Sequence, residues 1–361
     1  MHRYRSIQKK DHQKMPKKRT SPFRLLTLAL FALITASGCT GDKPNSPFDE
    51  ELDYKTLEAK NSFSFDEIFN PQTIRVIDNT LFVVESDNPD VSFHVLTIDP
   101  DHQSLEYKQG SGRRGEDPGE FMGISDIVET DSLLYFYDGQ QLKLTPYDKS
   151  TGQLAVRDDI HLRTNGRAVN FFSAGDDRFI GIGLFFGKRF NIMNMDGETV
   201  AEHGELIEFN EDFSRRDIAL GWFSYGMVQQ EEGNTNIYLF SRNADFIEKY
   251  DTGGQLLKRV QGEENPEPQM EIRNEWPVHT GSLSYVDVDS DGNHIYGLYS
   301  GLPGDEEHHG DMIHKFDRDL NLVDAYRLDN RFTKIAVDGN GNLITYSETD
   351  QGLDFHVYEL Y

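Results

Sequence analysis

A short polar turn followed by a run of hydrophobic residues occurs six times along the chain. The six runs cover residues 81–84, 133–136, 179–182, 237–240, 295–298 and 343–346. Their first residues lie about 46 to 58 positions apart, a period typical of propeller blades or other repeat arrays. The recurrence of a polar turn and a hydrophobic strand at this period predicts six similar β units.

Each repeat is consistent with four strands. The turns before the six runs are rich in Asp, Asn and Gly, as in Asp78-Asn79 or Gly339-Asn340-Gly341, and these residues tolerate the backbone conformations of tight hairpins. A third strand then ends in an aromatic or apolar residue followed by Asp, as at 147–148 and 250–251. A glycine-containing turn and a fourth strand, such as 255–258, follow in several repeats.

The sixth repeat lacks residues for a fourth strand, because the chain stops at Tyr361 soon after the hydrophobic residues 355–358. Residues 53–58, ahead of the first repeat, have the alternation of a strand and are expected to complete the last blade. Such closure removes the open sheet edge that a linear solenoid would have to cap. The predicted fold is all-β: a six-bladed β-propeller over residues 51–361, with its last blade closed by an N-terminal strand.

The first 38 residues differ in composition from the rest. They carry nine Lys or Arg and one acid, followed by the apolar run 25–34 and small residues up to Gly38. This order is typical of a secretory signal, and the apolar run is too short for a bilayer span, which needs about 20 residues. Because the basic segment is longer than in an ordinary signal, Met15 is an alternative start of translation.

Cys39 follows the small residues directly, and this junction resembles the lipobox of bacterial lipoproteins. The resemblance implies that Cys39 is lipidated (diacylated on sulfur) and becomes the mature N-terminus; ordinary cleavage beside an incidental cysteine is the alternative. Because Cys39 is the single cysteine of the chain, disulfides within the chain, structural Cys zinc sites and other cysteine nucleophiles are excluded. Residues 40–50 then form a tether, and Thr40 in place of Asp favours the outer membrane by resemblance to lipoprotein sorting.

The charge of the mature chain argues against nucleic acid as a partner. The whole chain has 36 Lys and Arg against 62 Asp and Glu; without residues 1–38, 27 basic residues face 61 acidic ones, a net charge of −34. Binding to a phosphate backbone needs a basic surface instead. The acidity fits either the solubility of an envelope protein or an acidic binding surface.

One segment carries a family resemblance. Residues 110–121, Gly-Ser-Gly-Arg-Arg-Gly-Glu-Asp-Pro-Gly-Glu-Phe, resemble the inter-blade segment of NHL-type propellers, with Asp117 in place of the usual Gly. Together with the six repeats and the lipobox, the chain resembles the TolB-like six-bladed propeller lipoproteins of Gram-negative bacteria. The resemblance covers about residues 51–361.

Two segments contain candidate metal ligands. The residues Asp287, Asp289 and Asp291 form the opening of a calcium loop, D-x-D-x-D-G, although Leu298 stands where an EF-hand has Glu. Calcium is therefore a possible cofactor, and a plain hairpin turn is the alternative. The adjacent His308 and His309 lie in the ligand-rich segment 304–311, for which a solvated loop is the alternative.

Candidate binding residues are arginines and aromatic residues in long connections. Arg113 and Arg114 could hold an anion within the glycine-rich segment, or that segment could serve only to connect blades. The connections 204–221 and 262–281, with the residues beside them, add further candidates, which could instead pack under their own loops. These candidates are Arg215, Arg216, Trp222, Phe223, Arg273 and Trp276.

Two functions fit these features. The first is a non-enzymatic envelope binding module that holds a protein, peptide or glycan through loops on one propeller face. The alternative is an envelope hydrolase or lyase with a metal-assisted site at the central channel. The sequence names no catalytic residue, since neither a nucleophile motif nor a carboxylate pair at an inferable distance stands out.

Overall fold

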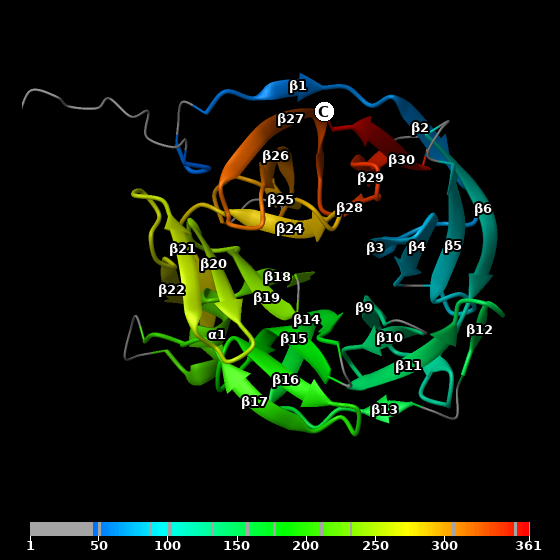
Figure 1. The fold of residues 1–361 in the computed structure, drawn as a ribbon, viewed down its shortest axis with the longest axis horizontal. Helices are drawn as coiled ribbons and strands as arrows, with labels where there is room; N and C mark the ends of the chain where they lie inside the picture. The colour runs from blue at the N-terminus through cyan, green and yellow to red at the C-terminus, as the bar shows by residue number, and fades with distance from the viewer. Residues whose placement is uncertain are drawn as a thin grey trace, which may run out of the picture. The chain divides into compact units, whose positions relative to one another are not determined.

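The computed structural model describes residues 46–49, 52–86, 88–99, 103–130, 133–155, 159–175, 178–208, 213–231, 233–304, 308–349 and 352–360. Within them the chain forms six β-sheets arranged as blades around a common axis (Figure 1). The expected signal peptide and Cys39 lie outside the described residues.

The first four blades are antiparallel meanders of consecutive strands. Blade one contains β3 (Pro71–Ile77), β4 (Thr80–Glu85), β5 (Phe93–Asp99) and β6 (Ser104–Ser111). Blade two contains β9 (Ile124–Glu129), β10 (Leu134–Asp138), β11 (Lys143–Asp148) and β12 (Gln153–Leu154), with β13 (Ile160–His161) also paired to β11. Blade three contains β14 (Gly166–Ser173), β15 (Arg178–Phe185), β16 (Phe190–Asn194) and β17 (Thr199–His203). Blade four contains β18 (Ser224–Glu231), β19 (Asn234–Ser241), β20 (Phe246–Asp251) and β21 (Leu256–Gln261).

The last two blades each take a strand from the N-terminal segment. Blade five contains β24 (Tyr285–Ser290), β25 (Ile295–Tyr299), β26 (Gly310–Phe316) and β27 (Leu322–Phe332), and β1 (Lys55–Leu57) joins its outer edge. Blade six contains β28 (Ile335–Val337), β29 (Asn342–Thr349), β30 (Gly352–Glu359) and β2 (Asn61–Ser64). The connections hold two strand pairs, β7 (Arg113–Arg114) with β8 (Glu120–Phe121) and β22 (Met270–Arg273) with β23 (Trp276–His279), and the helix α1 (Arg215–Gly221).

The six predicted hydrophobic strands are confirmed as the second strands of the six blades. Every residue of β10 is buried, and β4 and β19 are buried over most of their length. The reason is that both faces of each blade pack against neighbouring blades, so an inner strand has no polar face. The continuous apolar runs therefore reflect burial on two sides.

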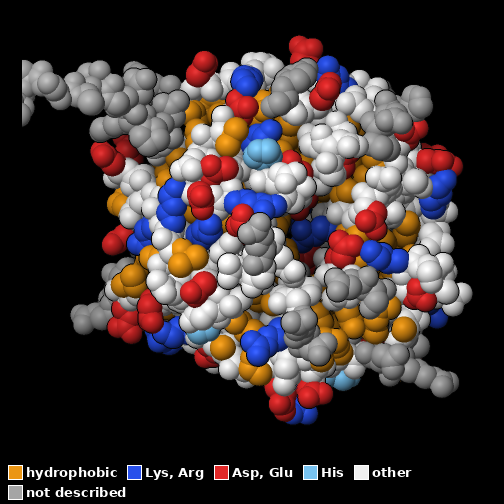
Figure 2. All heavy atoms as spheres, in the orientation of Figure 1, with side chains coloured by type: hydrophobic (Ala, Val, Ile, Leu, Met, Phe, Trp, Pro, Cys, Tyr) orange, Lys and Arg blue, Asp and Glu red, His pale blue; other side chains and the backbone are white. Residues whose placement is uncertain are grey.

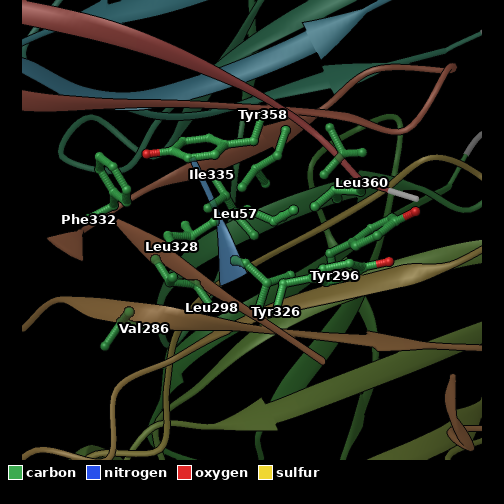
Figure 3. Packing of buried hydrophobic residues seen from close by; sticks show 13 residues of the cluster. Leu57, Val286, Tyr296, Leu298, Tyr326, Leu328, Phe332, Ile335, Tyr358 and Leu360 are labelled. Carbon is green, nitrogen blue, oxygen red and sulfur yellow. The ribbon is translucent and has the colours of Figure 1, made fainter. Parts of the chain in front are cut away.

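The closure of the ring is confirmed, but the expected closing strand was wrong. β2 pairs antiparallel with β30, with Phe63 opposite Phe355, and so completes blade six. Residues 55–57 instead form β1, which runs parallel to β27 in blade five. The reason is that Leu57 is buried in the hydrophobic cluster between blades five and six (Figure 3). By contrast, β2 packs Phe63 against the next cluster and hydrogen-bonds Ser62 and Ser64 to side chains of β30.

The two faces of the ring differ in their connections. In each meander, the turns between strands one and two and between strands three and four lie at one end, which we call the turn face. The loops between strands two and three and the links to the next blade lie at the other end, which we call the loop face. On the turn face, Asp78 and Gly292 adopt φ angles of 53° and 85°, as tight hairpins require.

Helix α1 lies in the connection between blades three and four. Ser214 caps it: the Ser214 hydroxyl accepts a hydrogen bond from the Asp217 N–H, and the Asp217 carboxylate accepts one from the Ser214 N–H. Ile218 and Ala219 bury the inner side of the helix. Within the described residues, no helix is both long and apolar enough to cross a bilayer.

Candidate functional site

The topology brings the candidate arginines and aromatic residues to the loop face, because all of them lie in links between blades or beside them. Arg113 and Arg114 lie between blades one and two, Arg215 and Arg216 between blades three and four, and the β22–β23 hairpin between blades four and five. His308 and His309 lie in the loop between β25 and β26 on the same face. Asp291 lies on the turn face, in the turn between β24 and β25.

The β22–β23 hairpin is an insertion outside the six blades. Arg273 and Trp276 are its last paired residues, and Asn274 and Glu275 between them have φ angles of 52° and 68°, typical of a two-residue hairpin turn. Trp276 is 65% exposed and Ile272 is 45% exposed. The hairpin therefore presents a large aromatic side chain, an apolar side chain and an arginine to solvent.

The base of the hairpin is fixed to blade four. The Thr280 N–H donates to the Gln269 carbonyl at 2.8 Å, which closes the hairpin at its base. Gly262 N–H donates to the Asp245 carbonyl at 2.7 Å, and Asn265 Nδ2 donates to the Ser282 carbonyl at 3.0 Å. The exposed tip is thus carried on a rigid base.

Trp222 and Phe223 have a different environment, since both are buried. Trp222 Nε1 donates to the Ile207 carbonyl at 2.8 Å, and the indole packs 5.5 Å from the Phe246 ring. Phe223 lies under the guanidinium of Arg242, 5.8 Å from its ring centre. Trp222 and Phe223 therefore pack under their own loops, which was the alternative to a binding role for these two residues.

A buried ion cluster holds the same connection in place. Arg189 pairs with Glu248, donates to Ser224 Oγ at 2.7 Å and lies over the ring of Phe246. Arg259 also pairs with Glu248. Burial alone would raise the pKa of Glu248, but the two arginines lower it below its usual range. This cluster is structural, because each charge faces another protein group.

The remaining arginine candidates are exposed and scattered. Arg215 approaches Glu208 at 3.9 Å, and Arg216 is exposed beside it on α1. Arg114 in β7 donates to the Ser86 carbonyl at 3.3 Å, which ties the link to blade one, and Arg113 is exposed. The glycine-rich link thus has a clear connecting role.

Histidine and arginine side chains meet between blades four, five and six on the loop face. Arg242 donates to the ring of His308 at 2.6 Å, and Arg331 donates to Nε2 of His309 at 3.2 Å. Burial, and next the charge of Arg242, lower the pKa of His308; burial lowers the pKa of His279 nearby. The two adjacent histidines therefore face different arginines.

The central channel contains Arg75, Asp126 and Lys334, which the sequence did not single out, together with the candidate metal ligands Asp287 and Asp289. Arg75 of β3 bridges the channel to Asp126 of β9 at 2.5 Å and to Asp289 of β24 at 3.3 Å. Lys334 approaches Asp287 at 3.2 Å. Figure 2 shows basic and acidic side chains close together around the centre of one face. Sequence signals were absent because the partners come from blades far apart in the chain.

The channel carboxylates also join neighbouring blades. Asp126 accepts the Phe171 N–H at 2.9 Å, Asp287 accepts the Ile335 N–H at 2.9 Å, and Asp289 accepts the Val337 N–H at 2.8 Å. Burial raises the pKa of Asp289 to about 6, although Arg75 opposes the shift. Asp287 and Asp289 therefore tie blade five to blade six.

Asp291 stabilises its own hairpin turn. Its carboxylate accepts hydrogen bonds from the backbone N–H groups of Asn293 and His294, both at 2.7 Å, and from the Tyr296 hydroxyl. Among the residues that the structure describes, no three His, Cys, Asp or Glu side chains gather as a metal site. The proposed calcium ligands therefore lie at separate places, in the channel and in a turn.

The fold defines the protein as a six-bladed β-propeller with its chemically varied loops on one face. The family model described as TolB-like 6-blade propeller-like matches residues 47–340, more than half of the chain. The chain belongs to this family.

No curated protein matches the sequence. Among solved structures, the chain is similar to a protein from Bacteroides fragilis described as exported, with a TM-score of 0.53, 11% identity, and coverage of 85% of this chain and 95% of that chain. It is also similar to virginiamycin B lyase from Staphylococcus aureus, with a TM-score of 0.46, 11% identity, and coverage of 83% and 99%. At this identity the likeness concerns the fold alone.

Proposed function

We propose that the protein is a lipid-anchored, non-enzymatic binding module of the cell envelope. Its loop face would hold an envelope protein, peptide or glycan, and its outer-membrane anchor would be Cys39. The β22–β23 hairpin carries this proposal, because it presents Trp276, Ile272 and Arg273 to solvent on a fixed base. Exposed Trp and Arg side chains are the residue types that contribute most to binding surfaces.

The N-terminal segment adds a geometric constraint to the proposal. Pro47 is buried and Phe48 packs against Tyr285 and Tyr299 of blade five. Cys39 precedes Pro47 by eight residues, a reach of at most about 30 Å for an extended chain. A lipid on Cys39 would therefore keep the loop face close to the membrane, and the resemblance to an exported protein supports an envelope location.

The channel gives less support to an envelope hydrolase or lyase. A catalytic carboxylate must be within hydrogen-bonding reach of the group that it protonates or deprotonates. Asp126, Asp287 and Asp289 are each occupied by a cation and by a backbone N–H of the next blade. The geometry of these carboxylates fits a role in joining blades. The loop face is therefore the better candidate for the functional site.

The test is a quantitative pull-down of the detergent-solubilised protein from envelope extracts. Trp276→Ala should reduce partner recovery at least tenfold, because loss of a central Trp costs about 2 kcal/mol or more. Leu257→Ala is the matched control, since Leu257 is an apolar side chain with 46% exposure on β21. Equal recovery with both variants would show that the hairpin is not the binding surface.

A further inference from the structure

A pocket on the loop face has one wall made by the N-terminal segment. This loop-face pocket has a volume of about 580 Å³, and in it Phe48 and Tyr54 face residues of blades four and five. A separate pocket on the turn face has a volume of about 620 Å³. Volumes of roughly 300–1,000 Å³ are typical of small-molecule sites. The loop-face pocket is therefore large enough for a mono- or disaccharide.

The N-terminal wall is held by specific contacts. Ser46 and Asp49 form a turn in which the Ser46 N–H donates to Asp49 Oδ2 at 2.8 Å. Phe48 packs with its ring centre 6.1 Å from that of Tyr299, and the Tyr54 hydroxyl lies 3.0 Å from Nε2 of the buried His314. The wall is thus formed by a docked segment that frames the pocket.

One side of the pocket is aromatic. Phe48, Tyr54 and Tyr299 line it, with Met312 beside them. Flat ring surfaces of this kind can pack against the C–H face of a sugar ring while the sugar hydroxyls remain free to form hydrogen bonds elsewhere. None of the described residues that line the turn-face pocket of similar volume is aromatic.

The other side is polar and offers donors and acceptors together. The buried Asp245 carboxylate accepts hydrogen bonds from the hydroxyls of Ser284 and Tyr299. Burial raises the pKa of Asp245 above its usual range. The side-chain amides of Asn265 and Gln269 line the same side. A ligand with several hydroxyl groups can satisfy such a mixed set, because each hydroxyl both donates and accepts.

The charge of the lining disfavours anions. Asp49, Asp245 and Glu264 contribute three carboxyl groups, whereas Arg327 is the single basic residue of the lining. Arg327 is itself engaged by Asp311 at 3.2 Å. A phosphate, a carboxylate or an acidic sugar would therefore meet like charge.

We propose that this pocket binds a neutral saccharide, stacked on Phe48 beside Tyr299 and hydrogen-bonded by Asp245 and Gln269. The proposal rests on the binding function proposed above and deepens it by naming a ligand class. The docked N-terminal segment is part of the site, so the site is complete only when that segment lies on the propeller.

The test is saturation-transfer NMR of the whole mature protein with neutral probes, N-acetylglucosamine, mannose and lactose, and with glucuronic acid and a Gly-Gly-Lys peptide as charged probes. At least one neutral sugar should bind saturably. Phe48→Ala and Gln269→Ala should each weaken that binding at least tenfold, because they remove the aromatic wall and a hydrogen-bonding group. Asn234→Ala, in the turn-face pocket, is the matched control and should leave binding unchanged.

Several results would overturn the proposal. These are the absence of saturable binding by every neutral sugar, tighter binding of glucuronic acid or the peptide, and sugar binding that survives both pocket variants in folded protein with an unchanged melting temperature. If Trp276-dependent partner recovery persists while the sugars fail, the saccharide proposal alone is wrong. If sugars bind but Trp276→Ala changes no recovery, the hairpin proposal is wrong instead.

Discussion

The two tryptophans of the chain occupy opposite environments on the same face. Trp222 is 4% exposed and packs beneath its connection, whereas Trp276 is 65% exposed on a hairpin. Trp222 directly follows one long connection and Trp276 lies within the other, so their sequence contexts look alike. Trp222 is buried because α1 folds its connection onto the ring. Trp276 is exposed because it lies near the tip of a projecting hairpin.

These environments predict opposite effects on stability. Trp222→Ala should lower the free energy of unfolding by about 3–5 kcal/mol, since it leaves a cavity and removes a buried hydrogen bond. Trp276→Ala should change it by less than about 0.5 kcal/mol. Urea unfolding followed by circular dichroism measures both. Similar losses for the two variants would contradict the assigned burial.

The channel residue Asp289 gives a pH-dependent prediction. Burial raises its folded pKa from the ordinary 3.8 to about 6. Between these values the folded state binds a proton that the unfolded state releases, so this group stabilises the fold at low pH. That contribution is lost as the pH rises through about 6.

Asp289→Asn removes this titration and keeps an oxygen that can accept the Val337 N–H. Urea unfolding at pH 5 and pH 7 should show that the wild type loses more stability over this interval than the variant does. The comparison of slopes cancels the titration of the many other acids. Parallel slopes would mean that the pKa of Asp289 is not raised.

At the scale of elements, the second strands were predictable because burial on two sides leaves a continuous apolar run. The closing strand was not, because β2 contains mainly polar, exposed residues around Phe63, and its pairing partners in β30 lie at the far end of the chain. Residues 53–58 gave the stronger alternating signal, but Leu57 packs at the boundary of blades five and six. The Arg75 bridge was invisible for a similar reason: its partners lie in distant parts of the sequence.

The assignment of β1 and β2 can be tested by truncation. A chain that begins at residue 60 loses β1 but keeps β2, and it should be less stable yet remain monomeric. A chain that begins at residue 66 also exposes the edge of β30, and exposed strand edges pair with other chains. Size-exclusion chromatography with light scattering should therefore show self-association only in the shorter chain. Monomers in both cases would contradict the role of β2.

At the scale of the whole molecule, the ring is acidic, and its candidate binding groups gather on the loop face. Length, period and alternation predicted the ring and its closure. Only the structure separates the exposed hairpin from the buried aromatic residues, because that distinction depends on how each connection packs. The saccharide pocket was equally hidden, since its walls come from the N-terminal segment and two blades.

The proposed membrane attachment depends on Cys39. Cys39→Ser should transfer the protein from the membrane fraction to the soluble fraction, because the lipid is attached through sulfur. Fractionation and mass determination of the mature N-terminus measure this. Persistent membrane association of a Cys39→Ser protein, or an unmodified Cys39 in the wild type, would contradict the lipid anchor.

In the proposed function, the protein binds its partner through the loop face. The most direct measurement is in-cell photocrosslinking from a photoreactive residue placed at Ile272 on the loop face or at Thr252 on the turn face. Both positions are exposed and belong to hairpins of the same region of the ring. We expect a discrete crosslinked product from position 272 that Trp276→Ala abolishes, and none from position 252. Equal products from both positions, or a product from position 252 alone, would contradict it.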